Sequence, residues 1–187
     1  MRIIGGRYRG RRLKTPKNNK IRPTADRVRE AIFNMLGEKI CNSRVLDLFC
    51  GTGSLGIEAL SRGASQAVFV DKNRASLELV KLNLELIGES EKALIFKSDV
   101  FKVFSRLAAE KMFFDIVFVD PPYKEQFHKT VLEELASKGL LAKGAVVVYE
   151  TSHKYKFTEP DPLYVMIKSK KYGDTKVSFF LYEGEEA

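Results

Sequence analysis

Four acidic residues of this chain each close a short apolar run, and carboxylates in such positions can bind a small polar ligand. They are Asp47, Asp71, Asp99 and Asp120. The runs have the length and composition of buried parallel strands. The carboxyl ends of such strands meet at one edge of a sheet, where ligands bind in open α/β folds. The sequence therefore predicts one polar site assembled from four strand ends.

A glycine-rich turn follows the first of these acids. Residues 45–56 read VLDLFCGTGSLG, in which Gly51, Gly53 and Gly56 match the G-x-G-x-x-G pattern of dinucleotide sites. NAD is one interpretation of that pattern, but Asp47 would repel a pyrophosphate. S-adenosylmethionine has no phosphate and carries an ammonium and a sulfonium, so a carboxylate beside it is favourable. We therefore predict a site for this cofactor, with S-adenosylhomocysteine as its product.

The second and third acids suit the other parts of the same cofactor. Asp71 comes 18 residues after Gly53 and is placed to accept hydrogen bonds from both ribose hydroxyls. Asp99 is placed to accept a hydrogen bond from the adenine amino group, although by itself it would be interpreted as a helix cap. The predicted cofactor-binding residues are Asp47, Phe49, Gly51, Gly53, Asp71, Lys72, Asp99, Val100 and Asp120.

The tetrapeptide Asp120-Pro121-Pro122-Tyr123 is the most specific pattern in the chain. An amino group on a nucleic-acid base is a poor nucleophile because its lone pair is delocalised into the ring. If the Asp120 carboxylate and the Pro121 carbonyl accept its two N–H groups, the nitrogen can aim its lone pair at a methyl donor. Two prolines hold that geometry, and the Tyr123 ring offers a stacking face to an unstacked base. These four residues are the predicted catalytic set, for direct transfer without a covalent intermediate.

The net charge of +8 comes from the first 22 residues, which hold nine Lys and Arg and no acid. The rest of the chain carries 23 basic and 24 acidic residues. Apolar residues and glycines between the arginines favour a short β-ribbon with an ordered basic surface, for which RNA or DNA is the natural partner. The predicted RNA-binding residues are Arg7, Arg9, Arg11, Arg12, Lys14, Arg22 and Arg27.

Apolar runs alternate with helical patterns from residue 44 onward, as in β-α-β units with a parallel sheet. We expect strands at 45–49, 67–71, 94–97, 115–120 and 145–150, and helices at 28–36, 54–62, 73–87, 100–110 and 125–138. Two final strands, at 163–168 and 176–182, are expected to flank a loop at 169–175. The predicted fold is α/β and Rossmann-like, with a basic extension at 1–22 and one catalytic domain at 23–187.

Composition limits the remaining function classes. Cys41 and Cys50 lack Cys-x-x-Cys spacing, and neither is placed like a catalytic nucleophile. Two cysteines and two histidines are also too few for a dedicated zinc site. No run approaches the roughly 18 apolar residues of a membrane span, and the first residues do not resemble a signal peptide. We expect a monomeric cytoplasmic protein with no metal and no membrane partner.

The motifs at 47–53 and 120–123 mark class I methyltransferases that act on amino nitrogens. With the segments at 2–13, 22–34 and 172–175, the chain closely resembles the bacterial RsmD family over nearly its whole length. This resemblance implies a seven-stranded sheet with an antiparallel last strand. It also implies methylation of guanine N2 in 16S ribosomal RNA, conventionally guanine 966, within the 30S subunit or an assembly intermediate. By the same analogy, Arg22, Thr24 and Arg27 face the cofactor and substrate cleft.

Three other functions compete with this interpretation. An adenine-N6 methyltransferase fits the tetrapeptide equally well, although 187 residues leave little room for a DNA-recognition domain. A glutamine methyltransferase for proteins usually has Asn where Asp120 stands, and it would give the basic segment no role. A nucleic-acid-binding protein with a degenerate cofactor site is disfavoured because the strand-end acids and the glycines are all present.

Overall fold

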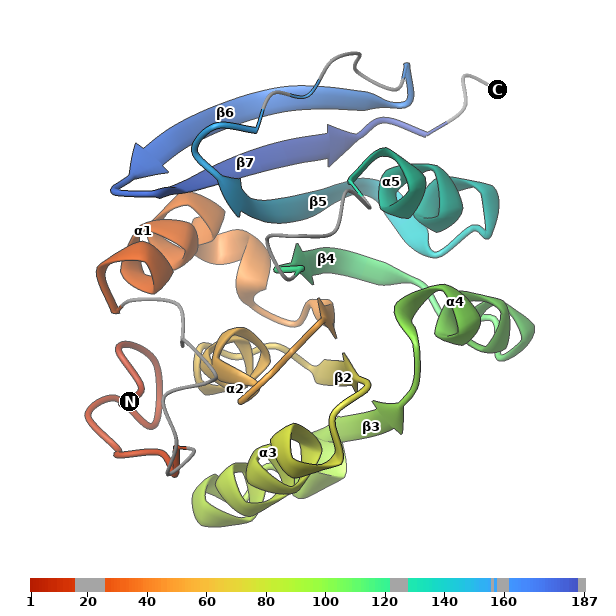
Figure 1. The fold of residues 1–187 in the computed structure, drawn as a ribbon. Helices are drawn as coiled ribbons and strands as arrows, with labels where there is room; N and C mark the ends of the chain where they lie inside the picture. The colour runs from red at the N-terminus through yellow and green to blue at the C-terminus, as the bar shows by residue number, and fades with distance from the viewer. Residues whose placement is uncertain (16–25, 122–127, 156, 158–161, 185–187) are drawn as a thin grey trace.

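A computed structural model of the chain describes residues 1–15, 26–121, 128–155, 157 and 162–184. Within them one seven-stranded sheet has the order β3-β2-β1-β4-β5-β7-β6 (Figure 1). The strands are β1 Arg44–Leu48, β2 Gln66–Asp71, β3 Ala93–Lys97, β4 Phe114–Val119, β5 Leu141–Ser152, β6 Tyr164–Tyr172 and β7 Thr175–Tyr182. Strands β1 to β5 are parallel, whereas β7 runs antiparallel to both β5 and β6. The mostly parallel sheet with an antiparallel last strand is therefore confirmed.

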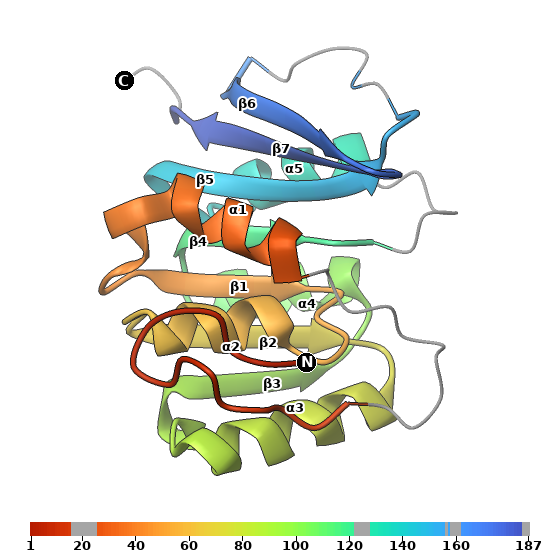
Figure 2. The same cartoon turned by 90° about the vertical axis from the view of Figure 1, so that its left-hand side faces the viewer.

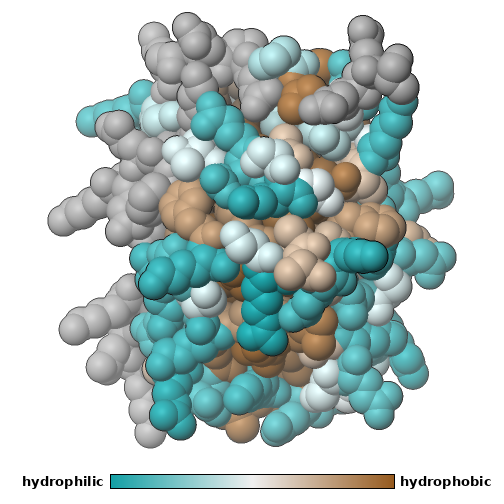
Figure 3. All heavy atoms as spheres, turned by 90° about the vertical axis from the view of Figure 1, so that its right-hand side faces the viewer, coloured by the Kyte–Doolittle hydropathy of each residue, from teal (hydrophilic) through white to brown (hydrophobic). Residues whose placement is uncertain are grey.

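Helices cover both faces of the sheet (Figure 1). On one face lie α1 Asp26–Leu36, α2 Ser54–Ser61 and α3 Arg74–Ile87, and on the other lie α4 Val100–Ala109 and α5 His128–Ser137. Two short 3-10 turns, η1 Gly37–Ile40 and η2 Ser90–Lys92, complete the described elements. On the side of α4 and α5, polar side chains are interspersed with small apolar patches (Figure 3).

Each face of the sheet has its own apolar core because successive side chains of a strand point to opposite faces. Val45 and Phe118 pack under α1, α2 and α3, whereas Leu46 and Val119 pack under α4 and α5. All four side chains are buried. Strands covered on both faces become continuous apolar runs, which is why the sequence pattern located them.

The N-terminal residues fold back on themselves and lie along α2 and α3 (Figure 2). Arg2 and Arg12 form one antiparallel bridge, and the amide of Ile3 donates to the carbonyl of Arg11 at 3.0 Å. The predicted ribbon therefore exists as a single bridge closed by turns. Gly6 permits the close approach to α2, since a Cβ at this left-handed position would lie 1.9 Å from the carbonyl oxygen of Ser61.

The C-terminal hairpin differs from its prediction. Strand β6 continues through Tyr172, so the loop expected at 169–175 is a two-residue turn of Gly173 and Asp174 between β6 and β7. The reason is that β6 is an edge strand, and residues 165–171 are exposed. Exposed strand residues need no apolar alternation, so the sequence pattern stops before the strand does.

Candidate active site

Acidic side chains from adjacent strands meet on one face of the sheet at its carboxyl edge. Asp47 of β1 pairs in register with Phe118 of β4, and Val119 pairs with Tyr149 of β5. Alternation therefore directs Asp47, Asp120 and Glu150 to the face that α1, α2 and α3 cover. These three acids therefore lie on one face of the sheet, near its carboxyl edge.

The glycine-rich turn between β1 and α2 is tightly constrained. Phe49 has a positive φ of 56°, which is a costly conformation for a bulky residue. A Cβ on Gly53 would lie 2.9 Å from Val80, and one on Gly56 would lie 2.3 Å from the ring of Phe69. Only glycine lets α2 begin this close to β2 and α3.

Asp47 lies beneath this turn with 2% of its surface exposed. Its Oδ2 accepts a hydrogen bond of 2.9 Å from the amide of Gly56. Burial raises the pKa of the Asp47 carboxyl to about 8, Asp71 adds to the increase, and the Gly56 amide opposes it. A nearby cation would stabilise the charged form, which is the role that the sequence predicts for this residue.

Asp71 and Asp99 are bonded by groups of the chain itself. Asp71 accepts hydrogen bonds from the amides of Gly51 at 2.8 Å and Asn73 at 2.7 Å, so it ties the glycine-rich turn to the end of β2. The Asp99 side chain accepts from the amide of Phe101 at 2.9 Å and thereby caps α4.

Asp99 also forms an ion pair with Lys72, whose Nζ lies 2.9 Å from Oδ2. The hydrogen bond from Lys72 lowers the pKa of Asp99, and the cap to Phe101 adds to this effect. Two residues predicted to bind cofactor therefore contact each other. A carboxylate oxygen has two acceptor sites, so Asp71 and Asp99 can each accept further hydrogen bonds.

Asp120 directly follows β4, and Pro121 after it is buried. Burial raises the pKa of the Asp120 carboxyl well above its ordinary value, and the negative charges of Glu150 and Asp47 raise it further. Pro122 and Tyr123, the other two predicted catalytic residues, lie outside the described residues.

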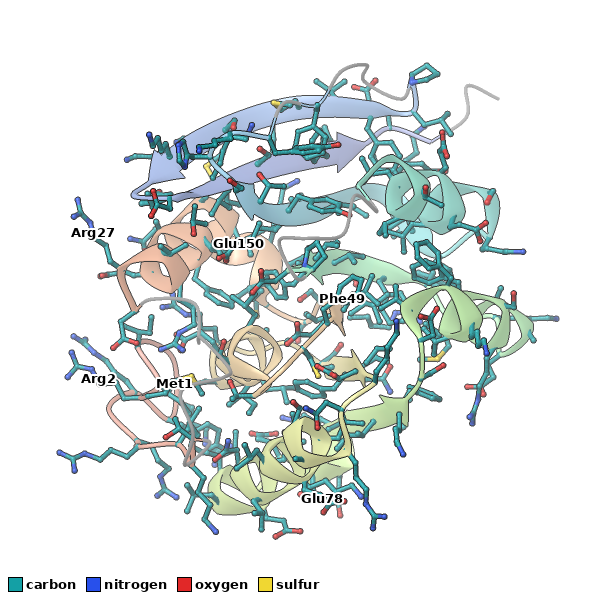
Figure 4. The ribbon with its side chains drawn as sticks, in the orientation of Figure 1. Met1, Arg2, Arg27, Phe49, Glu78 and Glu150 are labelled. Atoms are coloured by element: carbon teal, nitrogen blue, oxygen red, sulfur yellow. The ribbon has the colours of Figure 1, made fainter. Side chains whose placement is uncertain are left out.

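The predicted RNA-binding arginines are exposed on the segment that lies along α2 and α3. Arg7, Arg9, Arg11, Arg12 and Lys14 all have exposed side chains, as has Arg27 at the start of α1. Figure 4 shows Arg27 and Arg2 projecting away from the protein. Arg22 lies outside the described residues, as does the boundary expected between residues 22 and 23.

Buried polar groups hold that segment in place. Glu58 of α2, 1% exposed, accepts the amides of Ile4 at 2.8 Å and Gly5 at 2.7 Å. Asn83 of α3 exchanges two hydrogen bonds with the backbone of Lys14, at 2.7 and 3.1 Å. The basic surface is therefore ordered by helices that begin at the carboxyl edge of the sheet.

Met1 connects the same segment to the glycine-rich turn. The hydroxyl of Thr52 lies 3.9 Å from the Met1 sulfur. Figure 4 shows Met1 near α2. The N-terminal residue thus touches the turn that carries the predicted cofactor-binding glycines.

Sequence reasoning missed Glu58 and Glu150. No local signal marks this role of Glu58, because the backbone amides that it binds are more than 50 residues away. Glu150 lies two residues before the end of β5, and the four aspartates also lie within two residues of the ends of their strands, so the same rule would have found it. Among the described residues, no group of three or more His, Cys, Asp or Glu could hold a metal ion, and no helix is long and apolar enough to cross a membrane.

Known proteins are similar to this chain over most of its length. The family model described as "Conserved hypothetical protein 95" matches residues 1–181. The protein YlbH of Bacillus subtilis (strain 168) is 36% identical over 184 residues, 98% of this chain and 100% of its own length. Ribosomal RNA small subunit methyltransferase D of Escherichia coli (strain K12) is 40% identical over 152 residues, 81% of this chain and 74% of its own length.

Solved structures show the same fold. The Escherichia coli protein yhhF matches with a TM-score of 0.88 and 32% identity over 99% of both chains. An RNA methyltransferase from Salinibacter ruber, solved in complex with S-adenosyl-L-homocysteine, matches over 88% of this chain and 95% of its own with a TM-score of 0.66. At 14% identity that second likeness concerns the fold alone. Since the family model covers nearly the whole chain and the curated relatives are 36 and 40% identical to it, the chain belongs to the family of Conserved hypothetical protein 95, the RsmD family.

Proposed function

We propose that the protein transfers a methyl group from S-adenosylmethionine to the exocyclic N2 of a guanine in small-subunit ribosomal RNA. The observation that carries this proposal is the Asp120–Pro121 strand end beside a glycine-rich turn and the buried Asp47. It is supported by the name of the Escherichia coli relative, a ribosomal RNA small subunit methyltransferase. The substrate is 16S RNA in the 30S particle or an assembly intermediate, guanine 966 by family resemblance.

The residues at this edge fit the cofactor. Asp47 is a buried carboxylate that a cation would stabilise, and Asp71 has acceptor sites left for ribose hydroxyls. Phe49, Gly51 and Gly53 form the turn against which the methionine part would lie. Asp99 and Val100 stand at the adenine end, where Lys72 forms an ion pair with Asp99. S-adenosylmethionine supplies an electrophilic methyl group on a sulfonium.

The chain's own part in the reaction is to orient the amine and take up its proton. The Asp120 carboxylate and the Pro121 carbonyl accept the two N–H groups, so that the nitrogen lone pair faces the methyl group. Because the amine becomes more acidic as its bond to carbon forms, its proton leaves late, to Asp120 or to water. The raised pKa of the Asp120 carboxyl suits this residue to accept the proton.

Cysteine chemistry plays no part in this scheme. Burial raises the pKa of the Cys50 thiol well above its ordinary value, and Asp47 and Asp71 raise it further. A neutral, buried thiol is a weak nucleophile. Direct transfer from the cofactor to the base therefore needs no covalent enzyme intermediate.

The N-terminal segment supplies the RNA-binding surface. Reversing the charges of Arg9, Arg11 and Arg12 should weaken RNA binding at least about tenfold and reduce its salt dependence, while the affinity for cofactor stays within about twofold. Filter binding at several salt concentrations measures the first effect, and calorimetry measures the second. The matched control reverses three exposed basic residues at and just after α4, on the opposite face, namely Lys102, Arg106 and Lys111. Equal losses in the two triple variants would refute this assignment.

The product identifies the reaction. The protein is incubated with labelled S-adenosylmethionine and either naked 16S RNA, 30S particles that lack the modification, or DNA, and the methylated nucleoside is identified by mass spectrometry after digestion. N2-methylguanosine supports the proposal, and the substrate that yields it shows which assembly state is used. N6-methyladenosine or its deoxy form would keep the chemistry and overturn the substrate. No transfer to any of them would refute the proposal.

A further inference from the structure

Glu150 adds a fifth carboxylate near the carboxyl edge of the sheet, beside Asp120. Val119 and Tyr149 are partners on the parallel strands β4 and β5, so the next residues, Asp120 and Glu150, occupy neighbouring positions on backbones about 4.8 Å apart. Both point to the face that carries Phe118 and Val148. Glu150 is 7% exposed, and Figure 4 shows it on the side of β5 that faces α1.

Two carboxylates this close are costly unless N–H donors or protons compensate their charge. Burial and the charge of Glu150 together raise the pKa of Asp120. A carboxylate has about four acceptor sites, so it can accept hydrogen bonds from more than one donor at a time. A ligand with two adjacent N–H groups would satisfy both strand ends together.

Guanine has such an edge, because its N1–H and its 2-amino group are neighbours. Resting on the proposed function, we infer that Glu150 recognises the target base by accepting a hydrogen bond from guanine N1–H while Asp120 accepts from the 2-amino group. Adenine has an acceptor at N1, which would face the lone pairs of Glu150. An Asp-Pro-Pro-Tyr sequence suits any planar amino group, so Glu150 makes the site selective for guanine.

The test compares guanine with 2-aminopurine, which keeps the 2-amino group but has an acceptor at N1. Particles of the 30S subunit are reconstituted with 16S RNA that carries either base at the target position. For the wild type, kcat/KM should be at least about 100-fold higher with guanine, because a site built around an N–H group rejects analogues that lack it. A wild-type ratio below about threefold would overturn the inference, and this measurement needs no variant.

Glu150→Gln then assigns the selectivity to this residue. The amide can accept from guanine N1–H or donate to N1 of 2-aminopurine, so the ratio should fall to about tenfold or less. Cofactor affinity should stay within about threefold, which shows that the variant is folded. Glu38→Gln is the matched control, since Glu38 is exposed in η1 before β1, at the opposite edge of the sheet. A folded Glu150→Gln variant with the wild-type ratio would overturn the role of Glu150.

The same experiment separates this inference from the proposed function. If the wild type forms N2-methylguanosine and only the ratios fail, the proposed function stands and the inference falls. If the wild type leaves the guanine particles unmethylated, the proposed function falls and the inference falls with it.

Discussion

The strand-end acids form two groups that differ in what surrounds them. Asp71 at the end of β2 and Asp99 just after β3 are half-buried, and they accept hydrogen bonds from backbone amides of the adjoining turns and of the first turn of α4. Asp47, Asp120 and Glu150, on β1 and at the ends of β4 and β5, lie on the covered face close to one another's charge. The first group stabilises loop geometry. The second brings carboxyl groups together where a cationic cofactor and an N–H-bearing base would bind.

The largest effect should come from the second group, at Asp120. Asp120→Asn replaces an acceptor oxygen with an amide that donates, so the target amine loses its orientation and its proton acceptor. We expect kcat to fall at least about 1,000-fold, at the upper end of what one preorganised polar group contributes. The cofactor dissociation constant should change less than tenfold. Single-turnover transfer and calorimetry measure the two quantities, and turnover within tenfold of wild type would refute the mechanism.

The next effect concerns Asp47 and the cofactor. Asp47→Asn keeps an acceptor for the Gly56 amide but removes the charge, so cofactor affinity at pH 8 should fall about 100-fold. In the wild type a bound cation lowers the pKa of Asp47 from about 8, so binding releases a proton and affinity rises with pH up to about 8. Calorimetry from pH 6 to 9 measures this slope. A variant with the wild-type slope would show that Asp47 does not contact the cation.

The stability of the folded chain without cofactor should fall as pH rises, whereas the affinity for cofactor rises. The pKa of Asp47 is raised from 3.8 to about 8, so the folded chain binds more protons than the unfolded chain between these values. This contribution makes the wild type less stable as pH rises from about 4 to about 8, with no further change above that. Asp47→Asn should therefore melt at a higher temperature than wild type at pH 8 and at nearly the same temperature at pH 4. Equal melting temperatures at pH 8 would contradict the environment assigned to this carboxyl.

Asp71→Asn tests the first group. The asparagine side chain can accept from only one of the amides of Gly51 and Asn73, so one of the two hydrogen bonds is lost at a cost of about 0.5–1.5 kcal/mol. The loosened turn should reduce cofactor affinity about tenfold, less than Asp47→Asn does. The pH slope of binding should be unchanged, because Asp47 is intact. If cofactor affinity no longer depended on pH in this variant, the two groups of acids would not be independent.

The sequence signals at the carboxyl edge of the sheet are local. An acid lies within two residues of the end of each of β1, β2, β3 and β4, and Gly53 and Gly56 stand where a side chain would clash with Val80 or Phe69. The same rule applied to β5 would have found Glu150. At the carboxyl edge of the sheet, backbone conformation and charge depend on residues that are only a few positions apart in the sequence.

The parts that escaped prediction depend on distant contacts or on exposure. Glu58 lies 53 and 54 residues from the amides that it binds, and Asn83 lies 69 residues from Lys14. No spacing rule indicates such partners. The exposed edge strand β6 gives no apolar signal in its second half, so the sequence pattern predicts a loop for that half alone.

The smallest effect should come from replacing Lys72. This variant tests whether the first group, Asp71 and Asp99, stabilises the loops or binds the cofactor. Its side chain is 61% exposed and pairs with Asp99, and exposed ion pairs of this kind contribute about 0–1 kcal/mol. Lys72→Met should therefore change cofactor affinity less than about threefold and lower the melting temperature slightly, because Asp99 still caps α4. Calorimetry and thermal melting of this variant beside Asp71→Asn make the comparison. A tenfold loss of affinity with an unchanged melting temperature would instead mean that Lys72 contacts the cofactor, as the sequence predicts from its position after β2. The β2–β3 end of the site would then bind the cofactor through a basic side chain as well as through acids.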